Sequence, residues 1–240
     1  MAFEDSGSLL GHRDEQLLAP FRSAGGELRV SLGDMRTRLA GVKAFLFDWD
    51  GVFNAGVKGT GTPSGFSESD AMGTNLLRFG WWLRDDRVPF VGILTGQDNP
   101  AAVSLAERES FQVVYRGFLD KMHALGDLQT RFDIRAEQIC FLFDDVLDLG
   151  VAHACGLRIL VRNGAAPLLR VWAEREQRFD YATGREGGRH AVREASELML
   201  GLVDRYDEAV RERSVHSERY RRYLVQRNET SPAVLTPGDL

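Results

Sequence analysis

The stretch AFLFDWDGVF, residues 44–53, carries the most information about the fold. It is an apolar run of strand length that ends in two carboxylates, Asp48 and Asp50, with Gly51 directly behind them. Side chains alternate between the faces of a strand, so we expect both carboxylates to project together from the strand's end. Two carboxylates held close together favour a cation or a shared proton between them. Gly51 allows a sharp turn and the close approach of a ligand. Taken alone, the pattern also fits a buried strand that ends in an acidic turn.

Similar apolar runs recur along the chain and alternate with helical patterns. The runs cover residues 43–47, 89–94, 111–115, 139–143 and 157–161. The helical patterns cover residues 72–84, 99–109, 119–131 and 146–155, and a closing helix is expected over 189–203. This alternation predicts an α/β fold with an open, doubly wound, Rossmann-like parallel sheet and right-handed crossovers.

Three parts are expected along the chain. Residues 1–40 are expected to form an N-terminal extension. Its last part has the apolar spacing of a helix, and its earlier part is expected to be poorly ordered. The sheet domain should span residues 41–203. Residues 204–240 mix arginines with acids and are expected to form a charged helix, or an arm that contacts a partner, followed by a flexible tail.

Composition and charge exclude several classes of function. The net charge of −5 gives no electrostatic footprint for nucleic acid. No apolar window is long enough to span a membrane, and the first twenty residues lack the apolar core of a signal peptide. Cys140 and Cys155 lie in apolar surroundings without a CxxC spacing. They are expected to be buried thiols of a cytoplasmic protein.

Polar residues also follow the later strands. Thr95 and Gly96 come directly after one apolar run, Lys121 lies on the helix after the next, and Asp144-Asp145 with Asp148 follow a third. Each has an ordinary explanation when taken alone, such as a turn, a solvated lysine or a helix N-cap. In open α/β sheets, however, ligands bind at the carboxyl ends of the strands, where all of these spots belong.

Together these residues fit phosphoryl transfer to an aspartate. Asp48 would attack phosphorus, and Asp50 would protonate the leaving oxygen and then activate water. Thr95 and neighbouring backbone N–H groups would hold phosphate oxygens, and Lys121 would neutralise the shared charge. Asp144, with Asp48 and the backbone carbonyl of Asp50, would offer oxygen ligands to Mg²⁺.

These motifs resemble the haloacid dehalogenase superfamily of aspartate-nucleophile phosphatases, and within it the 3-deoxy-D-manno-octulosonate 8-phosphate phosphatase family. The resemblance covers about residues 42–202. Its stretches are FLFDWDGVFNAG, FSESDAMGTNLLRF, ILTGQ, YRGFLDK, FLFDDVLDLGVAHACGLRILV and DYATGREGGRHAVREASELML. It implies a magnesium-dependent sugar-phosphate phosphatase that forms a homotetramer, in which neighbouring subunits complete one another's sites. The expected substrate contacts are Gly51, Gly96, Gln97 and Asp70.

The chain departs from that family pattern at three places. Phe143 stands before the paired aspartates where glycine is usual, so it either crowds the metal site or extends the buried strand. Gln97 stands where arginine is common, and glutamine cannot clamp a carboxylate bidentately. The sequence SESDAMG, residues 67–73, also differs from the family pattern around Asp70.

No cap domain fits between the motifs. Beyond one helix and one strand, the gap from Asp50 to Thr95 leaves about 15 residues, enough for a small β-hairpin flap near residues 52–66. An acyl phosphate needs an enclosed site with controlled access of water. Either a neighbouring subunit supplies the cover, or the substrate is macromolecular.

Three functions follow from these patterns. The first is a magnesium-dependent phosphomonoesterase that acts on a small phosphorylated sugar or keto-sugar acid, as a homo-oligomer with no nucleic-acid or membrane partner. The second is a capless phosphatase of proteins or nucleic-acid ends. The third is a non-catalytic oligomeric scaffold, against which the complete set of acids argues.

Overall fold

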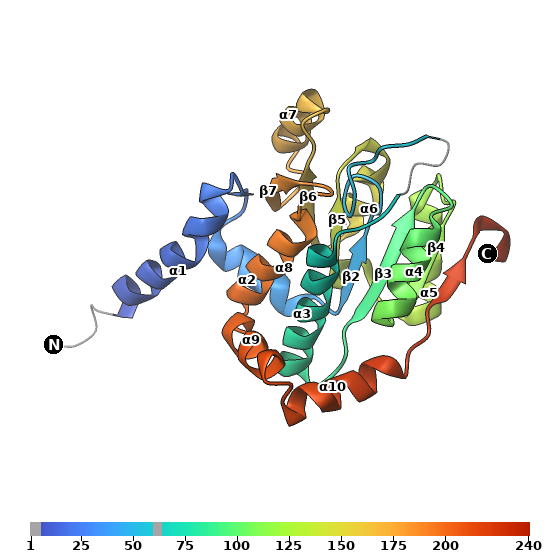
Figure 1. The fold of residues 1–240 in the computed structure, drawn as a ribbon. Coiled ribbons are helices and arrows are strands. Elements are labelled where there is room, and N and C mark those ends of the chain that lie inside the picture. The colour runs from blue at the N-terminus through green and yellow to red at the C-terminus, as the bar shows by residue number, and fades with distance from the viewer. Residues whose placement is uncertain (1–5, 60–63) are drawn as a thin grey trace.

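A mixed sheet of eight strands forms the centre of the molecule (Figure 1). The computed structural model describes residues 6–59 and 64–240. The strand order is β1-β7-β6-β5-β2-β3-β4-β8, and all neighbours are parallel except β1 and β7. The strands are β1 (Glu27–Leu28), β2 (Ala44–Phe47), β3 (Phe90–Thr95), β4 (Val113–Arg116), β5 (Ile139–Phe143), β6 (Leu157–Arg162), β7 (Tyr181–Glu186) and β8 (Ala233–Leu235).

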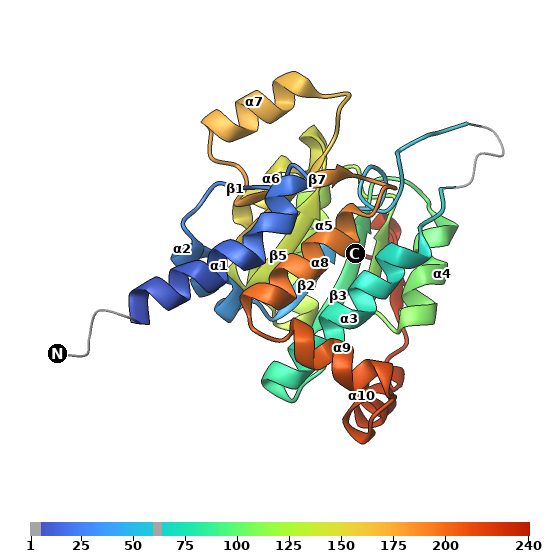
Figure 2. The same cartoon turned by 60° about the vertical axis from the view of Figure 1, so that its left-hand side comes forward.

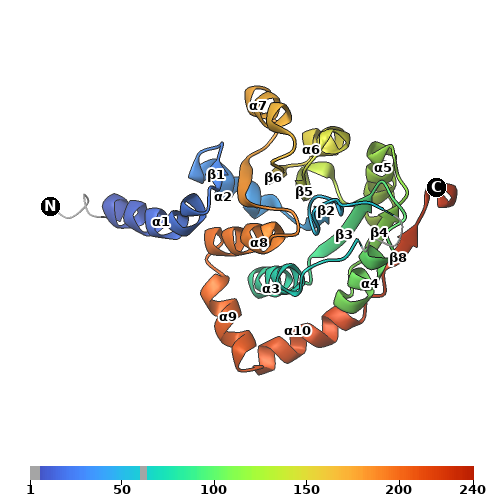
Figure 3. The same cartoon turned by 45° about the horizontal axis from the view of Figure 1, so that its top comes forward.

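Helices cover both faces of the sheet (Figures 1 and 3). One core cluster joins the sheet to α1, α2, α3, α4, α8, α9 and α10, and the other joins it to α5, α6 and α7. The helices are α1 (Ser6–Ser23), α2 (Leu32–Gly41), α3 (Glu68–Asp85), α4 (Pro100–Glu109), α5 (Lys121–Phe132), α6 (Leu149–Ala154), α7 (Pro167–Arg175), α8 (Ala191–Leu202), α9 (Tyr206–Ser214) and α10 (Glu218–Asn228), with short 3-10 turns η1 (Ala136–Gln138), η2 (Val146–Asp148) and η3 (Pro237–Asp239).

Strand β2 shows why the apolar run forms a central strand. Phe45 and Phe47 enter the first cluster, and Ala44 and Leu46 enter the second. All four are at most 1% exposed, as expected for a strand covered on both faces. Because β2 lies between β3 and β5, the strand order reverses beside it, and such a switch point is where open α/β sheets bind ligands. The predicted doubly wound α/β fold is confirmed.

The N-terminal segment is more ordered than expected. Before the expected helix α2, the structure forms helix α1 and the short strand β1, which pairs antiparallel with β7. Leu18 on α1 is 4% exposed and belongs to the first core cluster. The close approach of α1 to α8 needs Gly201, where an added Cβ would lie 2.5 Å from Leu17 Cδ1. The segment before α2 thus contains a helix and a short strand, which the sequence pattern did not indicate.

The C-terminal segment forms an arm rather than a free tail. Helices α9 and α10 run around the outside of α3, and the chain then reaches the far edge of the sheet (Figure 3). There β8 pairs in parallel with β4, with Val113 opposite Ala233. The expected flexible tail is thus an edge strand, because β4 would otherwise present unpaired backbone groups. The boundaries at residues 41 and 203 stay predictions.

The expected β-hairpin flap is a loop in its described parts, residues 51–59 and 64–66. One isolated bridge joins Asp50 and Asn54, and no strand ladder forms in these residues. Residues 60–63 of the predicted hairpin lie outside the described residues. None of the described helices is both long and apolar enough to cross a membrane.

Candidate active site

The loop after β2 directs its two carboxylates into one cavity. Trp49 between them turns the other way, stacks on Phe53 with ring centroids 4.9 Å apart, and donates from Nε1 to the Ser64 carbonyl at 3.0 Å. This buried ring anchors the loop, so Asp48 and Asp50 both line the cavity. The cavity has a volume of about 680 Å³. It is also lined by Gly51, Thr95, Gly96, Gln97, Lys121, Asp144, Asp145 and Asp148, and by residues that follow β6 and β7.

Lys121 lies at the start of α5 and joins two of the carboxylates. Its Nζ donates to Asp48 Oδ1 at 2.6 Å and also to Asp148 Oδ1. All three side chains are at most 6% exposed. Burial alone would lower the pKa of Lys121, but the charges of Asp48 and Asp148 outweigh it and raise that pKa. The two carboxylates thus favour the charged form of Lys121 beside Asp48.

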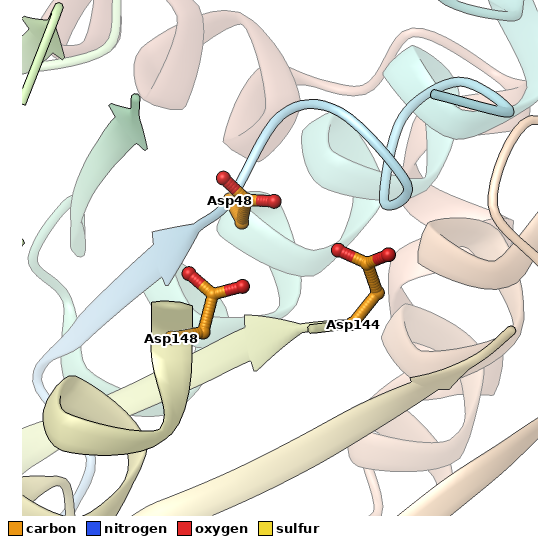
Figure 4. Close-up of side chains that lie close together, drawn as sticks. All are labelled: Asp48, Asp144 and Asp148. Atoms are coloured by element: carbon orange, nitrogen blue, oxygen red, sulfur yellow. The ribbon is translucent and has the colours of Figure 1, made fainter. Parts of the chain in front are cut away.

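Asp48, Asp144 and Asp148 form an acidic cluster (Figure 4). One carboxylate oxygen from each lies within 4.8 Å of the others. Burial and the charge of Asp148 raise the pKa of Asp48 well above its usual range. Burial and the same charge raise the pKa of Asp144 to about 7. Three acids face a single ammonium group, so a divalent cation would relieve the repulsion.

The cluster also has the vacant oxygens that a cation needs. Asp144 Oδ1 is buried and has no hydrogen-bond partner among the described residues, and Asn163 Nδ2 donates to Asp144 Oδ2 at 3.1 Å. The contact of Asp48 with Lys121 uses Oδ1 and leaves Oδ2 for a ligand. Asp148 differs, since its Oδ1 accepts from Lys121 and its Oδ2 from the backbone N–H of Asp145. The donors thus fit Mg²⁺ held by Asp48 and Asp144, and Asp148 mainly holds Lys121.

Gly51 is shaped to receive Asp144. Its φ of +87° is unfavourable for other residues, and an added Cβ would lie 2.0 Å from Asp144 Oδ2. This close approach explains why a glycine follows Asp50 and places the Asp144 carboxylate against the β2 loop. Gly51 therefore shapes the site through its backbone.

Asp50 has partners of its own and lies outside the acidic cluster. Lys58 and Ser64 from the following loop donate to it, Ser64 at 2.6 Å, and Asn99 Nδ2 donates at 2.9 Å. Burial alone would raise the pKa of Asp50, but these hydrogen bonds outweigh it and lower that pKa. Its side chain is therefore not placed as a metal ligand, and only the predicted role of its backbone carbonyl is left open.

Thr95 ends β3 beside Asp50. Its Oγ1 accepts from Asn99 Nδ2 at 2.8 Å and from the backbone N–H of Gln97 at 3.3 Å. Asn99 thus bridges Thr95 and Asp50, a contact that the sequence reasoning missed. Asn99 occupies the N-cap of α4 but makes no capping bond, because its amide is turned to the site. The sequence signal for it was an asparagine four residues after Thr95, which resembles an ordinary cap.

The packing around Asp70 and Phe143 bears on two further expectations. Asp70 is fully buried, accepts from Ser67 Oγ at 2.7 Å and from the Arg193 backbone N–H at 2.9 Å, and does not line the cavity. It joins the N-termini of α3 and α8 instead, and its expected contact with substrate stays a prediction. Phe143 is fully buried and stacks on Phe141. It extends the strand and does not crowd the acids.

Comparisons with known proteins relate this chain to phosphatases. No protein-family model matches the chain. It is 28% identical over 192 residues to the 3-deoxy-D-manno-octulosonate 8-phosphate phosphatase of Escherichia coli strain B, covering 78% of this chain and 96% of that protein. It is 29% identical over 180 residues to the corresponding enzyme of Yersinia pestis, covering 73% of this chain and 89% of that protein.

Solved structures agree with these relatives. The Yersinia pestis enzyme superposes with a TM-score of 0.60 at 27% identity, over 72% of this chain and 89% of that one. The Moraxella catarrhalis enzyme, solved with a magnesium ion, a phosphate ion and KDO, gives a TM-score of 0.61 at 25% identity, over 75% and 98%. In sequence and in fold the chain therefore resembles phosphatases of the haloacid dehalogenase superfamily, and among them the 3-deoxy-D-manno-octulosonate 8-phosphate phosphatases.

Proposed function

We propose that this phosphatase is a magnesium-dependent phosphomonoesterase that hydrolyses a phosphorylated sugar or keto-sugar acid through an aspartyl phosphate on Asp48. The observation that carries the proposal is the convergence of Asp48, Thr95, Lys121 and Asp144 on one cavity at the carboxyl end of the sheet. The names of the similar enzymes, and the KDO bound in one of them, support the sugar-acid class.

The reaction would proceed in two displacements. The Asp48 carboxylate attacks phosphorus to form the acyl phosphate, while Asp50 protonates the departing sugar oxygen. Asp50 then takes a proton from the water that hydrolyses the acyl phosphate, which releases phosphate and restores Asp48. Because Lys58 and two further donors favour ionised Asp50, it must be protonated and loosened from Lys58 before it acts as the acid.

The remaining residues would stabilise charge. Thr95 and the backbone N–H groups of Gly96 and Gln97 would donate to phosphate oxygens, and Lys121 would offset the charge that Asp48 and the phosphate share. Mg²⁺ would be held by Asp48, Asp144 and the Asp50 carbonyl, and it would offset the repulsion between two anions.

We further propose that the enzyme works as a homotetramer in the cytoplasm, with a neighbouring subunit covering the open site. Apolar side chains stand exposed beside the cavity at Leu119, Met122, Val146 and Leu147, with exposed fractions of 44% to 70%. Exposed apolar side chains beside a site support a surface that another chain covers. Light scattering after size exclusion gives the subunit number. A monomer with full turnover of sugar phosphates would contradict the proposal.

The experiment is a turnover screen over phosphorylated sugars, sugar acids, phosphopeptides and phosphorylated oligonucleotides, with p-nitrophenyl phosphate as a generic ester and Mg²⁺ supplied. Asp48→Asn should abolish turnover, whereas Asp98→Asn, an exposed neighbour of the site with a 72% exposed side chain, should retain it. Wild-type turnover by Asp48→Asn would refute the nucleophile. Failure on every ester would favour the scaffold, and hydrolysis confined to phosphopeptides or phosphorylated oligonucleotides would favour the macromolecular phosphatase.

A further inference from the structure

A second cavity of about 470 Å³ adjoins the active site beneath α7, and we call it the α7 cavity. The α7 helix stands off the edge of the sheet on the two connections that follow β6 and precede β7 (Figure 2). Asp144, Arg162, Asn163 and Gly164 line both cavities. The two cavities therefore adjoin at these four residues.

Arg162 has a distinctive position between the two cavities. The register of β6 against β7 shifts between Leu160 and Arg162, and such irregularities redirect a side chain at the end of a strand. The backbone N–H of Arg162 donates to Thr183 Oγ1 at 2.9 Å. Its Nη1 donates to the Gly184 carbonyl at 3.3 Å and lies beside Gly25, which lines the α7 cavity.

The charge of Arg162 is also distinctive. Within residues 6–59 and 64–240, no carboxylate lies within ion-pair distance of its guanidinium. The other cations that line the two cavities are all paired, Arg170 with Glu27 at 3.0 Å, Lys58 with Asp50, and Lys121 with Asp48 and Asp148. An exposed guanidinium at the junction of two cavities is suited to bind an oxyanion bidentately.

We infer that Arg162 is a specificity-determining residue that binds a second anionic group, at the end of the substrate away from the phosphate that is cleaved. The inference rests on the proposed function and deepens it. It assigns the α7 cavity to the far end of the substrate, which would carry a carboxylate or a second phosphate. A cavity of about 680 Å³ is already within the usual range for a complete small ligand, so the additional space favours an elongated substrate.

The test compares pairs of substrates that differ in one terminal group. Gluconate 6-phosphate and sorbitol 6-phosphate differ by a carboxylate, and fructose 1,6-bisphosphate and fructose 6-phosphate differ by a phosphate. The measured quantity is the ratio of kcat/KM within each pair. Both members are assayed on the same preparation, so any loss of folded enzyme cancels in the ratio.

The wild-type enzyme should prefer the more anionic member of at least one pair by about tenfold or more, as expected for a charge-assisted pair at a partly exposed site. Arg162→Ala should remove this preference, and Arg162→Lys should restore part of it. The matched control is Arg175→Ala, which removes one positive charge from α7 at a side chain that is 67% exposed and lines neither cavity. It should leave both ratios unchanged.

Each outcome decides the matter. An Arg162→Ala ratio equal to that of the wild type overturns the inference, as does a loss that is equal for both members of each pair. The pair that shows the preference tells whether the group is a carboxylate or a phosphate. If the wild type cleaves no ester, the proposed function fails. The dissociation constants of the same pairs, measured by titration calorimetry, then test Arg162 separately.

Discussion

Substitution of Gly51 by alanine tests whether the β2 loop positions Asp144. The added Cβ would lie 2.0 Å from Asp144 Oδ2, whereas ordinary contacts begin at 3.4 Å. The Asp144 carboxylate must therefore move by about 1.4 Å, the difference between these two distances. A displacement of about 1 Å of a catalytic group can lower the rate by about 100-fold. We expect a loss of that order in turnover, with a weaker response to Mg²⁺.

The matched control is Gly56→Ala in the same loop. Gly56 also has a positive φ, +67°, but its nearest neighbour would lie 3.7 Å from the added Cβ. Both variants should lose about 1–2 kcal/mol of unfolding free energy through backbone strain. Only Gly51→Ala should disturb the acids. The assays are urea unfolding and a magnesium titration of p-nitrophenyl phosphate turnover. Equal turnover and equal magnesium dependence in the two variants would refute the reasoning.

Three other predictions address the same region. Mg²⁺ at about 100 times its dissociation constant should stabilise the folded protein by about 2.7 kcal/mol and raise its melting temperature by about 5–10 °C, and Asp144→Asn should abolish that shift in a thermal-unfolding assay. Asp148→Asn should lower kcat at least tenfold and destabilise the fold by about 1–3 kcal/mol, since buried Lys121 loses a charged partner. An unchanged kcat would show that Asp148 does not position Lys121 for catalysis. Asp70→Ala should lower the free energy of unfolding in urea by about 1–2 kcal/mol and leave kcat unaltered, because Asp70 joins two helix ends outside the cavity. A selective rise in KM would instead indicate that Asp70 contacts the substrate.

The fold was predictable where the chain is buried on both faces of the sheet. The apolar runs around Phe45, Ile93 and Phe141 predict β2, β3 and β5, since each of these side chains enters one of the two core clusters. Strand β7 was missed because its sequence YATGRE lacks such a run, and β8 has only three residues. Short edge strands take their conformation from a neighbouring strand, and local sequence does not specify that neighbour.

The candidate site divides in a similar way. Residues at strand ends were predictable, because parallel strands bring their carboxyl ends to one edge and so gather Asp48, Thr95 and Asp144. Side chains that act through a neighbouring residue could not be predicted from the sequence. Asn99 bridges Thr95 and Asp50 instead of capping its own helix, and Asp70 caps helices instead of facing the cavity.

The amino-acid sequence by itself determined the chemistry that is available, namely two carboxylates behind a central strand, with a threonine, a lysine and further acids after its neighbours. That follows from the periodicity and order of side chains, which are local properties of the chain. Tertiary structure alone decided how those groups share partners. Asp148 holds Lys121, Asp50 pairs with the loop after β2, and Arg162, between two cavities, has no carboxylate partner in the part of the chain that the structure describes. Asp148 and Lys121 follow different strands, and the two cavities are lined by segments from distant parts of the chain, so these arrangements form only when the sheet and its helices have packed.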